Sequence, residues 1–163
     1  MITFRNVVGF FETIAEKHLQ INSFHSGFMD EVDINKLGAT DYAILYAEPG
    51  NVVINQGVLT YNFTIFVMDM INDEVGDDPN KQRVGRVDGY SETLNILQDV
   101  VAEFKHSLTT QSWVDDEVVL QLPITADPFT ARFNNLLTGW SATISVDVNN
   151  KNNLCIAPIE ANS

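Results

Sequence analysis

The amino-acid sequence predicts an α+β fold, in which two amphipathic helices pack on a mostly antiparallel β-sheet. Apolar residues recur at helical spacing twice, at about residues 4–19 and 91–108, and strand-like segments follow each helix. The 163 residues are 45% hydrophobic, which is enough for one core and argues against a disordered chain. No linker or internal repeat divides the sequence. We therefore expect a single domain over residues 1–163.

The first helix is expected over residues 4–19, with Thr3 as its N-cap. Its predicted buried stripe consists of apolar residues spaced three and four apart: Phe4, Val7, Val8, Phe11, Ile14 and Ala15. The next segment, residues 21–28, is short and mixed in composition. It fits either a strand or an extended link.

Two strands and two turns are expected next. Residues 41–48 (DYAILYAE) are almost entirely apolar on both faces, which is typical of a strand inside a sheet. Pro49-Gly50 predicts a turn, residues 51–55 (NVVIN) a short strand, and Gln56-Gly57 a second turn.

The clearest strand spans residues 58–71. One face carries a continuous apolar row: Leu59, Tyr61, Phe63, Ile65 and Val67. The opposite face begins with polar residues and becomes apolar at Phe66, Met68 and Met70. We therefore expect a helix or a neighbouring subunit to cover that end of the strand, and we take these three residues as candidate partner contacts.

Residues 72–89 lack an apolar period and predict a long loop, and loops of this length are usually functional or mobile. An acidic run is followed by a basic one, which makes these residues candidate contacts: Asp73, Glu74, Asp77, Asp78, Lys81, Arg83 and Arg86. One interpretation is a solvated loop. The other is an arm whose basic half meets the acidic surface of a neighbouring copy.

The second helix is expected over residues 91–108, with Ser91 as its N-cap. Strands are expected at 118–124 and 140–148, and residues 126–135 are ambiguous. In the second strand, apolar residues alternate with polar ones and form one face: Trp140, Ala142, Ile144, Val146 and Val148. Residues 149–163 predict a polar tail that contains three further candidate contacts: Leu154, Ile156 and Ile159. These either pack on their own domain or add an extended segment to a partner's sheet.

The charge balance excludes some classes of partner. The chain has 22 acidic and 9 basic residues and a net charge of −13, which disfavours general nucleic-acid binding and attachment to anionic membranes. No apolar run has the length of a membrane span, and no secretory signal is evident, so we expect no membrane partner. The single cysteine, Cys155, excludes an intramolecular disulfide and fits synthesis in a reducing compartment.

No motif in the sequence indicates catalysis or a bound cofactor. The acidic run does not have the spacing of an EF-hand loop, because Ile71 follows two residues after Asp69 and Val75 two after Asp73. The three histidines do not have metal-binding spacing, and no nucleophile elbow or phosphate-binding loop is present. We expect no enzyme activity, no metal and no cofactor. An enzyme with an unrecognised acidic or metal site is the least favoured alternative.

The order of elements resembles that of small structural proteins of tailed-phage necks and tails, in particular the tail-terminator or tail-completion class. The resemblance rests on four segments: DYAILYAEPGNVVINQGVLTYNFTIFVMDMI, SETLNILQDVVAEFKHSL, GWSATISVDV and NNLCIAPIE. It implies a virion protein without an active site, made in the host cytoplasm. Such a protein forms a homo-oligomeric ring that links the portal or head–tail connector to the tail.

The resemblance also implies neighbours among the portal, neck and tail proteins, and DNA that passes through the ring without specific binding. Carboxylates that line such a passage would repel phosphate. The alternative is a small acidic adaptor or assembly chaperone of phage or bacterial origin.

Overall fold

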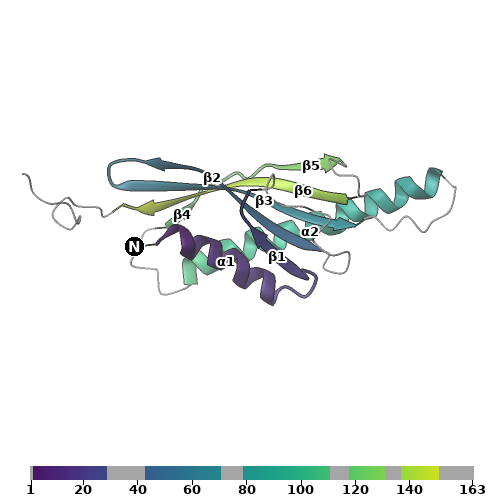
Figure 1. The fold of residues 1–163 in the computed structure, drawn as a ribbon, viewed down its shortest axis with the longest axis horizontal. Coiled ribbons are helices and arrows are strands. Elements are labelled where there is room, and N and C mark those ends of the chain that lie inside the picture. Colours follow the sequence, from purple (N-terminus) through teal and green to yellow (C-terminus); the bar gives the residue numbers. More distant parts are fainter. Residues whose placement is uncertain (1, 29–42, 71–78, 111–117, 131–136, 151–163) are drawn as a thin grey trace, which may run out of the picture.

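The fold, a computed structural model, is described for residues 2–28, 43–70, 79–110, 118–130 and 137–150. Within these residues, one six-stranded sheet carries two helices on one face (Figure 1). The predicted α+β class, with two helices on a mostly antiparallel sheet, is confirmed.

The sheet has the strand order β1-β2-β3-β6-β4, and β5 pairs with β6 along the same edge as β4. Only the short strand β1 runs parallel to its neighbour β2, and every other pairing is antiparallel. The strands are β1 (Ser23–Ser26), β2 (Ile44–Ile54), β3 (Val58–Met70), β4 (Val118–Leu120), β5 (Ala126–Thr130) and β6 (Leu137–Asn149).

Helix α1 (Phe4–Lys17) begins where its sequence predicts and ends two residues early. Thr3 and Asn6 form a capping box, because the Asn6 backbone N–H donates to Thr3 Oγ1 at 3.3 Å and the Thr3 N–H donates to Asn6 Oδ1 at 2.9 Å. The buried face of α1 consists of Val7, Phe10, Phe11, Ile14 and Ala15. Phe4, which we expected in this stripe, is instead 38% exposed.

The hydrophobic core lies between the helices and one face of the sheet. The apolar rows of β3 and β6 expected from their alternation form the floor of this core, with Phe63, Ile65, Ile144 and Val146 fully or almost fully buried. Above them, Phe11 of α1 stacks on a phenylalanine of α2. Neither helix lies on the opposite face of the sheet, which we call the open face although Met68 on it is buried (Figure 1).

Helix α2 spans Pro79–Thr110, so the predicted 72–89 loop is wrong from Pro79 onward. Proline suits the first turn of a helix, where its missing N–H has no partner to lose. Ser91 lies inside this helix and does not cap it. Residues 71–78 lie outside the described residues.

Gly89 was misleading as a loop signal, because its missing side chain has a packing role. A Cβ added at Gly89 would lie 2.6 Å from Cγ2 of the buried Thr138, so the missing side chain lets α2 approach β6 closely. Next to it, Trp140 Nε1 donates to the Tyr90 carbonyl at 2.8 Å. The glycine therefore serves helix–sheet packing and does not end the helix.

The predicted turn at Pro49-Gly50 is also wrong, because β2 continues through it. The pairing with β3 shifts by one residue between Pro49 and Val52, which is a β-bulge. A Cβ on Gly50 would lie 2.9 Å from the Asn62 carbonyl oxygen, so glycine permits this close approach. The turn at Gln56-Gly57 is confirmed.

The remaining strands differ from the sequence prediction mainly in length. The ambiguous segments contain β1 and β5, β4 ends at Leu120 well before the predicted residue 124, and β6 starts three residues before Trp140. Residues 151–163, the greater part of the predicted tail, lie outside the described residues.

Candidate functional site

Most of the predicted contact residues fall outside the described part of the chain. These are Asp73, Glu74, Asp77, Asp78, Leu154, Ile156 and Ile159. Lys81, Arg83 and Arg86 lie in the first turns of α2. Figure 1 shows this part of the helix projecting beyond the end of the sheet.

The predicted apolar contact at the end of β3 is largely covered within the folded chain. Met68 is 1% exposed. Phe66 is half-buried, and its ring contacts that of Tyr46 edge-on with centroids 6.3 Å apart. Met70 is the last residue of β3. Met68 therefore has almost no surface left for a partner.

The accessible apolar side chains of β2 and β3 lie at the opposite end of these strands, next to the turn. We call residues 51–61 the hairpin end. Ile54 is 76% exposed, and Val52, Val53 and Val58 are exposed by 41 to 44%. Large apolar side chains at such exposure on neighbouring positions are typical of interaction surfaces.

Strand register places these side chains on both faces of the sheet. Val52 pairs with Tyr61 and Ile54 with Leu59, which puts Val52 and Ile54 on the helix face. Val53 pairs with Thr60, which puts it on the open face. The hairpin end therefore exposes apolar side chains in two opposite directions.

The first turn of α1 marks the limit of the helix layer. The Phe4 ring stacks on Phe63 with centroids 5.2 Å apart and meets Tyr61 edge-on at 6.0 Å. Because Phe4 is the first residue of α1 and is partly exposed, the sheet beyond it loses its helical cover. This explains why Val52 and Ile54 are exposed although they continue the row of core residues.

Tyr61 anchors this boundary. Its hydroxyl donates to the Ile2 carbonyl at 3.3 Å. Burial raises the pKa of Tyr61 above its ordinary value, and a backbone hydrogen bond from Phe4 partly opposes this. The phenol therefore stays protonated and keeps its hydrogen bond where α1 meets the hairpin.

Hydrogen bonds also fix the hairpin end to β6. At the turn, Asn55 N–H donates to the Val58 carbonyl at 2.9 Å, and Gly57 has a positive φ of 82°. Asn150, just after β6, donates its backbone N–H to the Gly57 carbonyl at 2.9 Å and its side-chain amide to the Asn55 carbonyl at 3.3 Å. The hairpin end is thus held in place and presents a preformed surface.

A polar network supports the bulge behind this surface. Asn62 donates its side-chain amide to Asn51 Oδ1 at 2.7 Å and accepts from the Ser145 hydroxyl. Asn62 therefore links β2, β3 and β6 at the point where β2 gains its extra residue. This network fixes the direction in which residues 52–54 leave the bulge.

The outer edge of β2 is open beside the hairpin end. Strand β1 pairs with β2 only over Ile44–Ala47. Beyond Ala47, no strand within the described residues pairs with that edge, although β2 continues to Ile54. An edge of this kind presents unpaired backbone N–H and C=O groups to another extended segment.

Sequence reasoning recognised the NVVIN segment as a strand but did not predict that its apolar side chains are exposed. Three consecutive β-branched residues, Val52 to Ile54, make a strand apolar on both faces. That pattern usually marks a strand covered on both sides. Here it lies next to a turn and at the rim of a sheet, where neither helix nor any strand among the described residues covers it.

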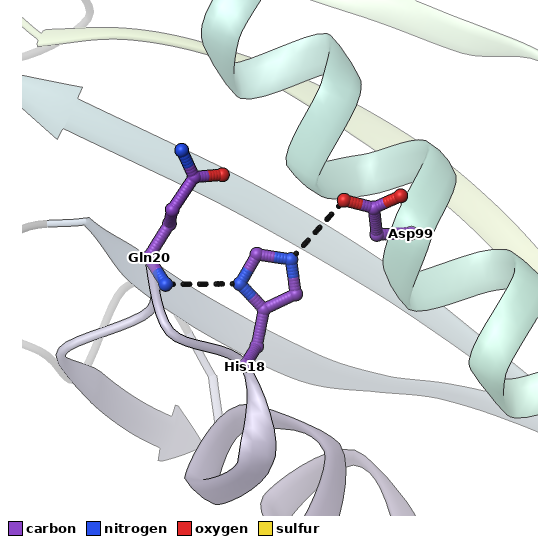
Figure 2. A network of polar contacts seen from close by, with 3 residues as sticks. All are labelled: His18, Gln20 and Asp99. Atoms are coloured by element: carbon purple, nitrogen blue, oxygen red, sulfur yellow. Dashed lines mark hydrogen bonds and ion pairs between the residues drawn. The ribbon is translucent and has the colours of Figure 1, made fainter.

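A second place with possible chemistry is an open cleft of about 570 Å³ between the end of α1 and the middle of α2. It is lined by Ile14, Lys17, His18, Asp99, Ala102, Glu103 and His106. Figure 2 shows His18 between the two helices. The Gln20 backbone N–H donates to His18 Nδ1 at 3.1 Å, so the ring proton is on Nε2, which lies 3.3 Å from Asp99 Oδ2.

This arrangement uses both ring nitrogens of His18 for hydrogen bonds within the fold. No serine, threonine or cysteine lines the cleft, so its described residues contain no hydroxyl or thiol nucleophile for a catalytic pair. Among the residues described by the structure, no group of three histidine, cysteine or carboxylate side chains is placed to hold a metal ion. The His18–Asp99 contact joins the end of α1 to the middle of α2.

Acidic and basic residues are equally numerous on the two helices. The acidic residues are Glu12, Glu16, Asp88, Glu92, Asp99 and Glu103, and the basic ones are Arg5, Lys17, Lys81, Arg83, Arg86 and Lys105. No helix in the described part of the chain is long and apolar enough to cross a membrane.

Comparison of the chain with models of known protein families and with curated proteins finds no match.

Proposed function

We propose that this chain is a non-enzymatic structural protein that assembles with copies of itself through the hairpin end. Its resemblance to phage neck and tail proteins extends the proposal to a ring-forming subunit of the tail-terminator or head–tail connector class. In the virion such a ring would link the portal or connector to the tail, and DNA would pass through it without specific binding.

The observation that carries the proposal is the exposure of apolar side chains on both faces of the hairpin end. Ile54 and Val52 extend the core surface beyond Phe4, and Val53 faces the other way. Burying Ile54 alone contributes about 1.5–3 kcal/mol. A surface that points in two directions can contact two neighbours. A head-to-tail contact closes into a ring when its rotation permits.

The hairpin end, from residue 51 to residue 61, contains no charged side chain. An uncharged contact surface lets a chain of net charge −13 associate without bringing carboxylates together.

The test compares the molar mass of the full chain with that of Ile54→Asp by size-exclusion chromatography with light scattering over a range of concentrations. We expect the wild type to form a discrete oligomer and Ile54→Asp to be a folded monomer. Leu19→Asp is the matched control, because Leu19 is 97% exposed beyond the end of α1 and should change nothing. A wild type that is monomeric at every concentration, or an Ile54→Asp oligomer of unchanged mass, contradicts the proposal.

The virion part of the proposal has its own test. Mass spectrometry of purified particles of the phage that encodes the chain should find the protein at a stoichiometry of several copies per particle. Its absence from the particles contradicts a neck or tail role and leaves the assembly role standing.

A further inference from the structure

The open edge of β2 at Asn51–Ile54 and the C-terminal segment of the chain are complementary. We infer that the C-terminal segment of one copy, around Leu154–Ala157, adds an antiparallel strand to this edge on a neighbouring copy. The inference rests on the proposed assembly function and names the contact that would carry it.

The edge offers both parts of a strand-addition site. Beyond Ala47 the outer side of β2 has no paired strand among the described residues, so alternate backbone groups of Asn51–Ile54 point outward. The side chains beside it are apolar and exposed, on the helix face at Val52 and Ile54 and on the open face at Val53. Backbone hydrogen bonds give such a site affinity, and alternate side chains give it specificity.

The sequence of the C-terminal segment matches this edge. Residues 154–157 read Leu-Cys-Ile-Ala, which in an extended conformation puts Leu154 and Ile156 on one side and the smaller Cys155 and Ala157 on the other. In an antiparallel register that pairs Val53 with Cys155, Ile54 lies opposite Leu154 and Val52 opposite Ile156. The large apolar pairs then lie on the helix face.

The two segments also end at corresponding points. Pro158 lacks an N–H and stops the pairing after Ala157. In the same register Ala157 lies opposite Asn51, which is the residue at the β2 bulge. Each segment therefore contributes four residues, bounded by a proline on one and by the bulge on the other.

The C-terminal segment begins next to the hairpin end, which is the reason for choosing it as the strand that pairs with the β2 edge of a neighbouring copy. Asn150 is fixed to the hairpin turn through the Gly57 and Asn55 carbonyls, and thirteen residues follow it. At about 3.3 Å per residue, an extended segment of that length reaches roughly 40 Å from the hairpin end, which is enough to lie along a neighbouring subunit. The segment carries one lysine and one glutamate, so it adds no net charge to the contact.

The test uses Cys155, the single native cysteine, as a probe. In Val53→Cys, mild oxidation of the full chain should produce a ladder of disulfide-linked dimers and larger species on a non-reducing gel. Directly opposite residues have Cβ atoms about 4.5–5.5 Å apart, close to the spacing of a disulfide. Val53→Cys with Cys155→Ser should give dimers at most, because each copy then has one thiol.

Val119→Cys is the matched control. Val119 is exposed at the opposite edge of the sheet, and this variant also keeps Cys155. It should give no ladder. Equal ladders from both variants overturn the inference, as does a Val53→Cys chain that forms only an internal disulfide and stays monomeric. An oligomeric wild type whose Val53→Cys variant forms no 53–155 link overturns the strand addition and leaves the assembly function intact. A wild type that never assembles overturns both.

Discussion

Replacing Gly89 by alanine tests the close approach of α2 to β6. In an isolated helix this change would stabilise by about 1 kcal/mol, because alanine has the better helix propensity. Here the added Cβ would lie 2.6 Å from Thr138 Cγ2, and Thr138 is 1% exposed, so its methyl group cannot move aside into solvent. Forcing an extra carbon into such a packed contact costs about 1–3 kcal/mol.

The two effects leave Gly89→Ala destabilised by about 1 kcal/mol, or about 3 °C in Tm for a domain of this size. Gly9→Ala is the matched control. Gly9 lies in α1, and a Cβ there meets nothing within 4 Å, so this variant should gain stability of about 0.5–1 kcal/mol. Urea unfolding followed by circular dichroism measures the unfolding free energy of both variants. Unchanged m-values show that each variant exposes the same surface on unfolding as the wild type.

Thr138→Ser removes the methyl group that the new Cβ would meet. The double variant Gly89→Ala with Thr138→Ser should therefore be more stable than the sum of the two single effects predicts. If Gly89→Ala is stabilising to the same degree as Gly9→Ala, α2 does not pack on β6 at this glycine. Close packing against Thr138 would then not explain why a glycine stands at position 89 of the helix.

Two further predictions concern the core and the hairpin boundary. Phe104→Ala should lower the unfolding free energy by about 3–5 kcal/mol in urea, because the ring is fully buried and stacks on Phe11 with centroids 4.7 Å apart. Phe28→Ala, at an exposed position, should stay within about 0.5 kcal/mol of wild type. Similar losses from both variants would contradict the described core. The unfolding free energy of wild type relative to Tyr61→Phe should be constant below pH 10.0 and fall above it, because the unfolded phenol ionises at its ordinary pKa while the folded one, with its raised pKa, keeps its proton. A difference that stays flat throughout the alkaline range would show that Tyr61 is not held protonated by burial.

The sequence predicted the parts of the fold that depend on simple periodicity. The alternation in β3 and β6 correctly separated the core face from the open face, and the spacing in α1 located most of its buried residues. These patterns succeed because burial on one face of a regular element leaves a direct trace in the order of residues.

The sequence failed where glycine and proline serve packing instead of chain reversal. Pro79 and Gly89 suggested a loop, and they lie in the first turn and at the sheet contact of α2. Pro49 and Gly50 suggested a turn, and they form a bulge inside β2. Whether such a glycine or proline reverses the chain or permits close packing depends on the strand beside it. That strand contributes Asn62 beside Gly50 and Thr138 beside Gly89, and both are distant in sequence.

The candidate surface could not be predicted from the sequence for a related reason. Phe66 and Met68, two of the apolar residues expected to be covered by a helix or a partner, lie where the folded chain already buries them partly or fully. Val52 to Ile54 carry the same kind of pattern at the uncovered end. Which end of a hairpin extends past the helices depends on where α1 begins on the sheet, and local sequence does not specify that position.

Hydrogen–deuterium exchange of the full chain in its assembled and dissociated states tests whether the hairpin end is the assembly surface. We expect assembly to slow exchange at the backbone amides of Asn51–Ile54 and to leave those of Val118–Leu120, at the opposite edge, unchanged. Assembly that protects other regions while Asn51–Ile54 exchange at the same rate as in the dissociated chain would contradict it.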